Sequence, residues 1–199
     1  MYKKGIWFIM EWVWKLVYVN LVWILFCLPV ITIIPSTFAL LAVANKWFKE
    51  DEEIDIFPTF WKQFKGLFWK SYLYGLTFII IGFFLFLNLQ LVNNGELDGP
   101  FFLTVHYALL VTSILYCVTM IYSVPLYLNF GFSVHKTLFF GLMVALKQPI
   151  ITIMVLIGVL LTILAFVFIT GFGFLFVGSL PALMMCKSNH YAMKKLKLT

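Results

Sequence analysis

Residues 71–99 read SYLYGLTFIIIGFFLFLNLQLVNNGELDG, an apolar run that ends in a loop with two acidic residues and no lysine. A helix needs about 20 apolar residues to cross a membrane, and the run 71–95 carries no charge. Pro100 follows the loop and suits the first turn of a second helix, where its missing N–H costs little. The sequence therefore predicts a membrane hairpin over 71–130, with its loop on the outer side.

The basic residues of the chain are all lysines, and they fall into four patches separated by the lysine-free stretches 16–45, 71–135 and 148–186. Basic residues near the ends of membrane spans stay on the cytoplasmic side. If all four patches are cytoplasmic, each lysine-free stretch must leave that side and return to it. This predicts three membrane hairpins, at about 6–50, 71–130 and 149–193, with the N- and C-termini in the cytoplasm.

Composition supports one integral membrane domain over residues 1–199. The chain is 63% hydrophobic and 11% charged, and its mean hydropathy is +1.03, whereas soluble domains are roughly 45–50% apolar and about 25% charged. We expect an all-α membrane protein with about six membrane-embedded helices. The net charge of +6 does not indicate a nucleic-acid partner, because the lysines flank apolar spans and form no single basic face. Anionic lipid headgroups of a bacterial cell membrane are the expected counter-charges.

The first and third hairpins contain sequence breaks. Leu28–Pro35 separates a helix ending near Cys27 from a return helix over 36–50, which Ser36 or Thr37 could cap. That return helix has few apolar residues, so we expect it to be short or re-entrant and packed against protein.

In the third hairpin, we expect Pro149 to start the outward helix and Thr170–Gly173 to form the break. The return helix should then start near Phe174 and contain a kink at Pro181.

Two amphipathic segments lie between the hairpins. In 57–70, the aromatic side chains follow a helical spacing and the lysines occupy the other side, which predicts a helix lying in the lipid headgroups. Segment 133–147 is a weaker version of the same pattern. We expect both to be cytoplasmic interfacial helices.

No group of residues indicates catalysis, a metal site or a cofactor. His106, His135 and His190 are far apart in sequence, and neither a zinc-protease motif nor a phosphate-binding loop occurs. The three cysteines, Cys27, Cys117 and Cys186, lie in apolar runs without CxxC spacing, so we expect buried thiols that behave as small hydrophobes. The sequence therefore predicts a protein that is not an enzyme.

The candidate binding residues are Glu11, Lys15, Asn20 and Pro35. Glu11 and Lys15 have the spacing of an ion pair on one helix face. Asn20 lies deeper in the first helix, where it could line a polar path or hydrogen-bond a neighbouring helix. We favour the second function for Asn20. Pro35 marks the break in the first hairpin.

Several short motifs resemble those of the YesL-like family of small bacterial membrane proteins, a domain of unknown function. They are Leu28-Pro29, Pro35-Ser36-Thr37, Ala39-Leu40, Phe57-Pro58-Thr59-Phe60-Trp61, Phe64, Phe68-Trp69-Lys70, Pro125-Leu126 and Leu180-Pro181-Ala182-Leu183. The resemblance covers nearly the whole chain, with lysines where we would expect arginines in the surface helix. It implies an association with carbohydrate importers of the ATP-binding-cassette (ABC) type in Gram-positive bacteria.

Two functions remain open at this point. The first is a non-enzymatic accessory protein that binds or stabilises a sugar importer permease through its helices. The alternative is a small transporter or channel that works without a partner protein, either alone or as an oligomer. This alternative predicts a polar cavity near Asn20 and the proline-broken helices.

Overall fold

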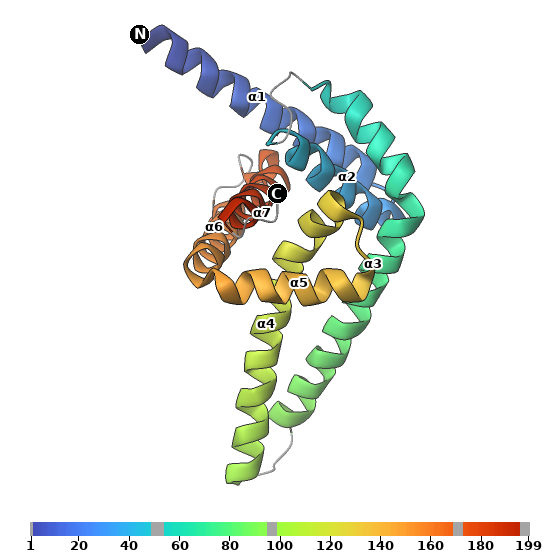
Figure 1. Cartoon of the computed structure of the whole chain (residues 1–199), viewed down its shortest axis with the longest axis vertical. Coiled ribbons are helices and arrows are strands. Elements are labelled where there is room, and N and C mark those ends of the chain that lie inside the picture. Colours follow the sequence, from blue (N-terminus) through green and yellow to red (C-terminus); the bar gives the residue numbers. More distant parts are fainter. Residues whose placement is uncertain (1, 49–53, 95–98, 169–172, 196–199) are drawn as a thin grey trace.

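The computed structural model describes residues 2–48, 54–94, 99–168 and 173–195, and every regular element in these ranges is helical (Figure 1). The α-helices are α1 (Tyr2–Cys27), α2 (Ile33–Lys46), α3 (Ile56–Asn94), α4 (Pro100–Phe130), α5 (Val134–Lys147), α6 (Pro149–Phe168) and α7 (Ser179–Lys195). Two short 3₁₀ helices, η1 (Val30–Thr32) and η2 (Gly173–Leu175), precede α2 and α7. The predicted all-α class is confirmed.

Within the described residues, three helices are long and apolar enough to cross a membrane. The segments are Met10–Cys27 of α1, Ile56–Val92 of α3 and Phe101–Phe130 of α4. Helices α5 and α6 form a fourth candidate span if they count as one, although they are bent by 102° at the break between them. The structure thus supports three or four candidate spans where the sequence predicted about six membrane-embedded helices.

The difference lies in two shorter helices. Helix α2 has 14 residues and is apolar but short, as expected for the first return helix. Helix α7 has only 17 residues and carries three lysines, so it is not among the candidate spans. The expected return helix of the third hairpin is thus present as α7, but it is shorter than expected and is not one of the candidate spans.

Helices α3 and α4 form the predicted central hairpin. They run side by side as an arm that projects from the rest of the molecule (Figure 1), and residues 95–98 of the expected loop lie outside the described residues. Pro100 is the first residue of α4, as predicted, and Gly131 ends it in the left-handed conformation with φ of 63°. Glycine suits that position because it has no Cβ to clash.

Helix α3 continues through residue 70 without a break. Its 39 residues correspond to about 58 Å at ~1.5 Å per residue, so the expected interfacial helix 57–70 and the span that follows are one helix. The apolar side of 57–70 packs inside the protein: Phe60 and Phe64 are buried, and their rings lie 5.2 and 5.1 Å from that of Phe26 on α1. The amphipathic pattern therefore marks a face that packs against protein.

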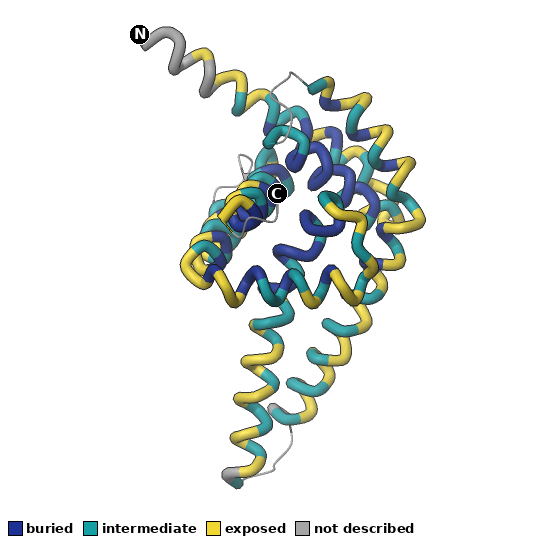
Figure 2. Tube along the Cα trace, viewed as in Figure 1, coloured by how far each residue is buried: buried dark blue, intermediate teal, exposed yellow. Residues whose placement is uncertain are grey.

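Helix α2 lies at the centre of the fold, with α1, α3, α4 and α7 around it. Ten of its residues are buried, which confirms that this segment packs against protein. It begins at Ile33, before the expected caps. Ser36 donates instead to the carbonyl of Phe26 at 3.1 Å, and Thr37 donates to Ile33 at 2.8 Å. Figure 2 shows the buried residues concentrated around α2, while the far half of the arm is exposed or half-buried.

Helix α5 crosses α4 at close range. A Cβ on Gly141 of α5 would lie 3.2 Å from the carbonyl oxygen of Thr119 and 3.5 Å from the backbone nitrogen of Ser123 on α4. Small residues allow helix backbones to approach in this way. The turn to α6 follows at once, with Pro149 as the first residue of α6, as predicted.

Asn20 of α1 fixes the start of α7. Its side-chain oxygen accepts hydrogen bonds from the backbone N–H groups of Gly178 at 2.9 Å and Ser179 at 3.2 Å, and its amide donates to the carbonyl of Phe174 at 2.9 Å. The side chain thus acts as a cap supplied from another helix.

Because α7 begins at Ser179, Pro181 falls in its first turn. No intrahelical hydrogen bond is lost there, so the reason for the expected kink disappears. The return helix also starts later than residue 174, and residues 169–172 of the expected break lie outside the described residues.

We expect Asn20→Ala to lower the free energy of unfolding by about 1–2 kcal/mol, because it leaves buried N–H groups at the start of α7 unpaired. Asn88→Ala is the control, since Asn88 donates only to Phe84 on its own helix and should change little. Thermal unfolding in a mild detergent measures both. Equal stability of the two variants would contradict the capping function.

A second pair tests the crossing of α4 and α5. Gly141→Leu should destabilise the fold by about 1–3 kcal/mol, because a side chain there meets the backbone of α4. Gly66→Leu is matched in chemistry, but no atom lies within 4 Å of its Cβ position. If Gly66→Leu destabilised the protein as much as Gly141→Leu in the same unfolding assay, the close crossing would not be the cause.

Candidate functional site

The candidate residues from the sequence do not form one site. Glu11 and Lys15 make the predicted ion pair on α1, with side-chain exposures of 48% and 24%. Asn20 is fully buried, and its amide group is occupied by the start of α7. The sequence suggested that Asn20 lines a polar path or forms hydrogen bonds to a neighbouring helix. The structure contains the hydrogen bonds.

Pro35 is buried in the first turn of α2. A proline at this position needs no intrahelical partner for its nitrogen, so it ends the break between α1 and α2 without loss of a hydrogen bond. The break itself is held by Thr32, whose hydroxyl donates to the carbonyls of Phe26 and Pro29 at 2.5 and 2.6 Å. The proline thus belongs to the packing of α2.

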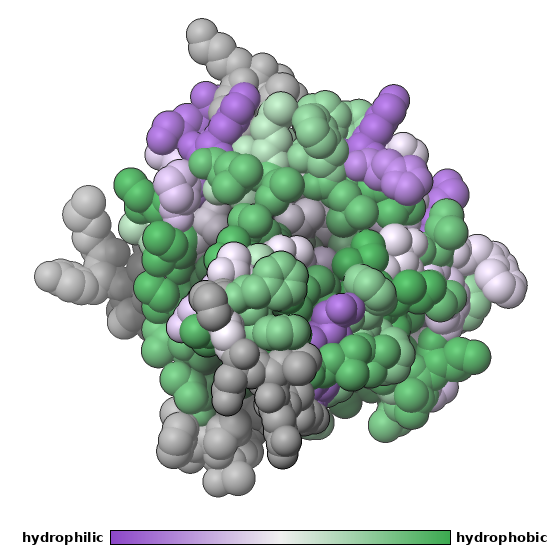
Figure 3. Space-filling view, turned by 90° about the horizontal axis from the view of Figure 1, so that it is seen from below, coloured by the Kyte–Doolittle hydropathy of each residue, from purple (hydrophilic) through white to green (hydrophobic). Residues whose placement is uncertain are grey.

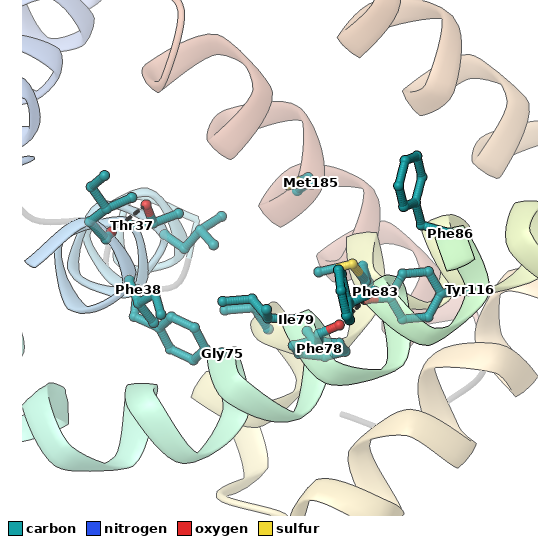
Figure 4. Close-up of a pocket in the computed structure, with 15 residues that line it drawn as sticks. Thr37, Phe38, Gly75, Phe78, Ile79, Phe83, Phe86, Tyr116 and Met185 are labelled. Atoms are coloured by element: carbon teal, nitrogen blue, oxygen red, sulfur yellow. Dashed lines mark hydrogen bonds between the residues drawn. The ribbon is translucent and has the colours of Figure 1, made fainter. Parts of the chain in front are cut away.

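The principal concave feature is an apolar cleft of about 640 Å³ at the root of the α3–α4 arm. Its walls come from α2, α3 and α4, with one methionine from α7 (Figure 4). The lining residues are Ile33, Ile34, Thr37, Phe38, Leu41, Gly75, Phe78, Ile79, Gly82, Phe83, Phe86, Tyr116, Met120, Val124 and Met185. We call this feature the arm cleft.

The polar side chains of the arm cleft already have partners within the protein. The Thr37 hydroxyl donates to Ile33 and accepts a hydrogen bond from the indole N–H of Trp23 at 3.3 Å. Tyr116 donates to the backbone carbonyl of Phe78. A ligand would therefore meet an apolar wall with no charged group. Such a cleft suits an apolar helix face or a lipid chain, and it offers little to a sugar.

Two glycines bring the walls of the arm cleft together. A Cβ on Gly75 would lie 2.6 Å from the side chain of Ile34 on α2, and one on Gly82 would lie 3.0 Å from the hydroxyl of Tyr116 on α4. Both glycines lie on α3, seven residues or two helical turns apart. They allow α3 to lie close to both neighbours along the same face.

A buried polar cluster ties α4, α6 and α7 together. The Tyr122 hydroxyl lies 3.0 Å from that of Thr152 and 3.2 Å from that of Ser188. One turn away, the Gln148 amide donates to the carbonyl of Ala192 at 3.0 Å. This cluster was not predicted from the sequence, although its hydroxyl residues lie in otherwise apolar runs.

A second polar contact joins α2 and α4. Asn45 donates to the side-chain oxygen of Asn129 at 2.8 Å. On α7, Asn189 is fully buried, and neither of its amide atoms has a hydrogen-bond partner among the described residues. Polar side chains therefore hold the helices together at several points inside the core.

Within the described residues, no group of three or more His, Cys, Asp or Glu side chains is placed to hold a metal ion. Cys186 is fully buried and donates to the carbonyl of Leu41 at 3.4 Å; burial raises the pKa of its thiol. Cys27 is half-buried, and Cys117 is exposed on α4. The prediction of three buried cysteines is therefore wrong for Cys117, whose side chain is exposed.

Residues 16–89 match the family described as "Protein of unknown function, DUF624". The chain is 26% identical to the uncharacterized protein YesL of Bacillus subtilis (strain 168) over 93% of this chain and 88% of YesL. It is 30% identical to YteU of the same organism, over 78% of this chain and 71% of YteU. No solved structure matches the chain.

A third relative, YesV of the same bacterium, is 28% identical over 74% of this chain and 72% of its own length. The matches to YesL, YteU and YesV span most of both partners, so they extend beyond the central hairpin and agree with the resemblance found in the sequence motifs. The chain therefore belongs to the DUF624 family of proteins of unknown function, with YesL, YteU and YesV among its relatives.

Proposed function

We propose that this protein is a non-enzymatic accessory component of a carbohydrate importer of the ABC type, and that it binds the permease through the arm cleft. The observation that carries the proposal is the apolar character of that cleft and of the arm around it. Seen from below the arm, the coloured surface is mostly hydrophobic, with hydrophilic residues along the upper rim and a smaller group near the centre (Figure 3).

The polar groups of the arm cleft are already hydrogen-bonded within the protein, which supports a function in binding a partner protein over one in recognising the sugar itself. Carbohydrate recognition needs unpaired hydrogen-bond donors and acceptors, since polar groups fix the orientation of a ligand. Thr37 and Tyr116 are already engaged inside the protein. A partner permease would therefore handle the sugar, and this chain would supply an apolar contact.

The shape of the cleft supports a protein partner over bulk lipid. Helices in a membrane associate through close packing, because lipid tails are as apolar as leucine side chains. A cleft of about 640 Å³ between three helices offers a partner side chain contacts on several sides. A flat helix face would offer the same hydrophobicity with fewer contacts.

The alternative of a self-sufficient transporter or channel requires a polar path near Asn20. Asn20 is fully buried, with its amide group engaged by Phe174, Gly178 and Ser179. It does not line the arm cleft. These contacts favour the accessory function.

We expect Ile79→Trp to reduce the amount of permease recovered with the protein by about tenfold. The larger side chain overpacks the interface, and a cost of ~1.4 kcal/mol weakens binding tenfold. Ile79 lines the cleft and is 57% exposed, whereas its neighbour Ile80 is 61% exposed and does not line it. Ile80→Trp is therefore the matched control. Affinity purification from native membranes in mild detergent, followed by mass spectrometry, measures the recovery.

Two outcomes would count against the accessory function. One is the absence of any importer subunit from the purified wild type, together with unchanged sugar uptake in a deletion strain. The other is solute flux in liposomes that contain only this protein, which would favour the transporter alternative.

The proposed orientation places both termini in the cytoplasm of a bacterial cell. In a cysteine-free background, Glu96→Cys should react with a membrane-impermeant thiol reagent from outside intact cells, and Lys194→Cys should react only after the membrane is opened. The reason is that lysine-rich segments remain on the cytoplasmic side. Labelling of both positions from the same side would disprove this orientation.

A further inference from the structure

A second concave feature lies between α6 and α7, and we call it the α6–α7 groove. It has a volume of about 580 Å³. The lining residues are Ile150, Ile151, Met154, Val155, Met184, Lys187, Ser188, Tyr191 and Lys195. The two helices lie side by side (Figure 1) and run antiparallel, since Gln148 bonds to Ala192 while a Cβ on Gly158 would meet Met184.

The two walls of the groove differ in chemistry. The α6 wall is entirely apolar, and its residues Ile150 and Met154 are 69% and 66% exposed. On the α7 wall, Lys187, Tyr191 and Lys195 recur every four residues, which places them on one face of the helix. The groove is therefore amphipathic along its length, with positive charge on one side and hydrocarbon on the other.

Nothing in the lining balances this charge. The lining contains no acidic residue, and no Asp or Glu follows Asp98 in the sequence. Neither Lys187 nor Lys195 has an ion-pair partner among the described residues. Among the described residues, no group therefore supplies a counter-charge to the groove, which leaves its lysines available to an anionic ligand.

Contacts with α4 hold the two walls of the groove in place. Thr152 of α6 and Ser188 of α7 both contact the hydroxyl of Tyr122 on α4. These hydroxyls are engaged in the core, so the groove offers charge and apolar contact with few other polar groups. Fixed walls reduce the ordering cost of a ligand that binds between them.

We propose that the α6–α7 groove binds one molecule of an anionic phospholipid, with the phosphodiester at Lys187, Tyr191 and Lys195 and an acyl chain along the α6 wall. A lysine ammonium is a compact charge that binds phosphate without a fixed geometry. The exposed apolar wall argues against a small soluble anion, which would leave Ile150 and Met154 unused. An acidic protein segment would leave the same wall uncovered.

The test uses the full-length protein, exchanged into nanodiscs with equal amounts of phosphatidylglycerol and phosphatidylcholine. The protein is then released from the nanodiscs, and native mass spectrometry measures how many molecules of each lipid remain bound to it. Wild type should retain phosphatidylglycerol selectively. The pair Lys187→Gln and Lys195→Gln should weaken this binding roughly 25-fold, at about fivefold for each basic residue near a lipid surface. The pair Lys62→Gln and Lys70→Gln removes the same charge from exposed positions on α3 and should leave retention unchanged.

A charge-neutral pair tests the apolar wall. Met154→Trp fills the groove and should abolish selective retention, whereas Ile153→Trp adds the same bulk to an exposed position outside the lining and should not. Unfolding temperatures of all variants must match that of the wild type. Equal retention of both lipids by the wild type would overturn the proposal, as would an equal loss in the α3 pair or full displacement by glycerol phosphate.

Discussion

The burial of α2 is the constraint on which the rest of the structure depends. This helix is too short to cross a membrane on its own, and its residues from Phe38 to Asn45 are all buried. Helices α1, α3, α4 and α7 each pack against it, so their positions follow from its surface. In lipid, such an arrangement gains from close packing of small side chains, and Ala39, Ala42 and Ala44 supply them at the centre.

Polar side chains then fix the helices that α2 alone could not orient. Asn20 joins α1 to the start of α7, and Tyr122 joins α4 to α6 and α7. In each case the polar atoms face other protein atoms, because an unpaired polar group is costly in an apolar environment. This explains why the core contains many polar contacts while the arm cleft presents none that are free.

The sequence predicted the features that depend on local chemistry. The central hairpin, the proline starts of α4 and α6 and the Glu11–Lys15 pair could each be predicted from neighbouring residues. Features that depend on distant contacts could not be predicted. The start of α7 depends on Asn20, which lies far away in the sequence, and this is why the expected helix start near Phe174 and the kink at Pro181 were wrong.

The same limit applies to the candidate sites. The amphipathic pattern of 57–70 is compatible with a lipid surface or with a protein surface, and the structure places Phe60 and Phe64 against protein. The arm cleft could not be predicted from the sequence, because its lining residues are as apolar as residues that face lipid. Its shape arises only when Gly75 and Gly82 bring α3 close to α2 and α4.

Shape is also what separates the two apolar surfaces of this protein in function. A lipid chain adapts to any smooth apolar face, so the outer side of the arm needs no specific partner. A cleft bordered by three helices leaves its lining with fewer contacts than a packed core provides, and a rigid side chain gains by filling it. The arm cleft has this geometry with no unpaired polar group to demand a particular ligand. A neighbouring membrane helix satisfies those conditions better than a sugar or an ion, and this is the physical basis of the accessory function that we propose.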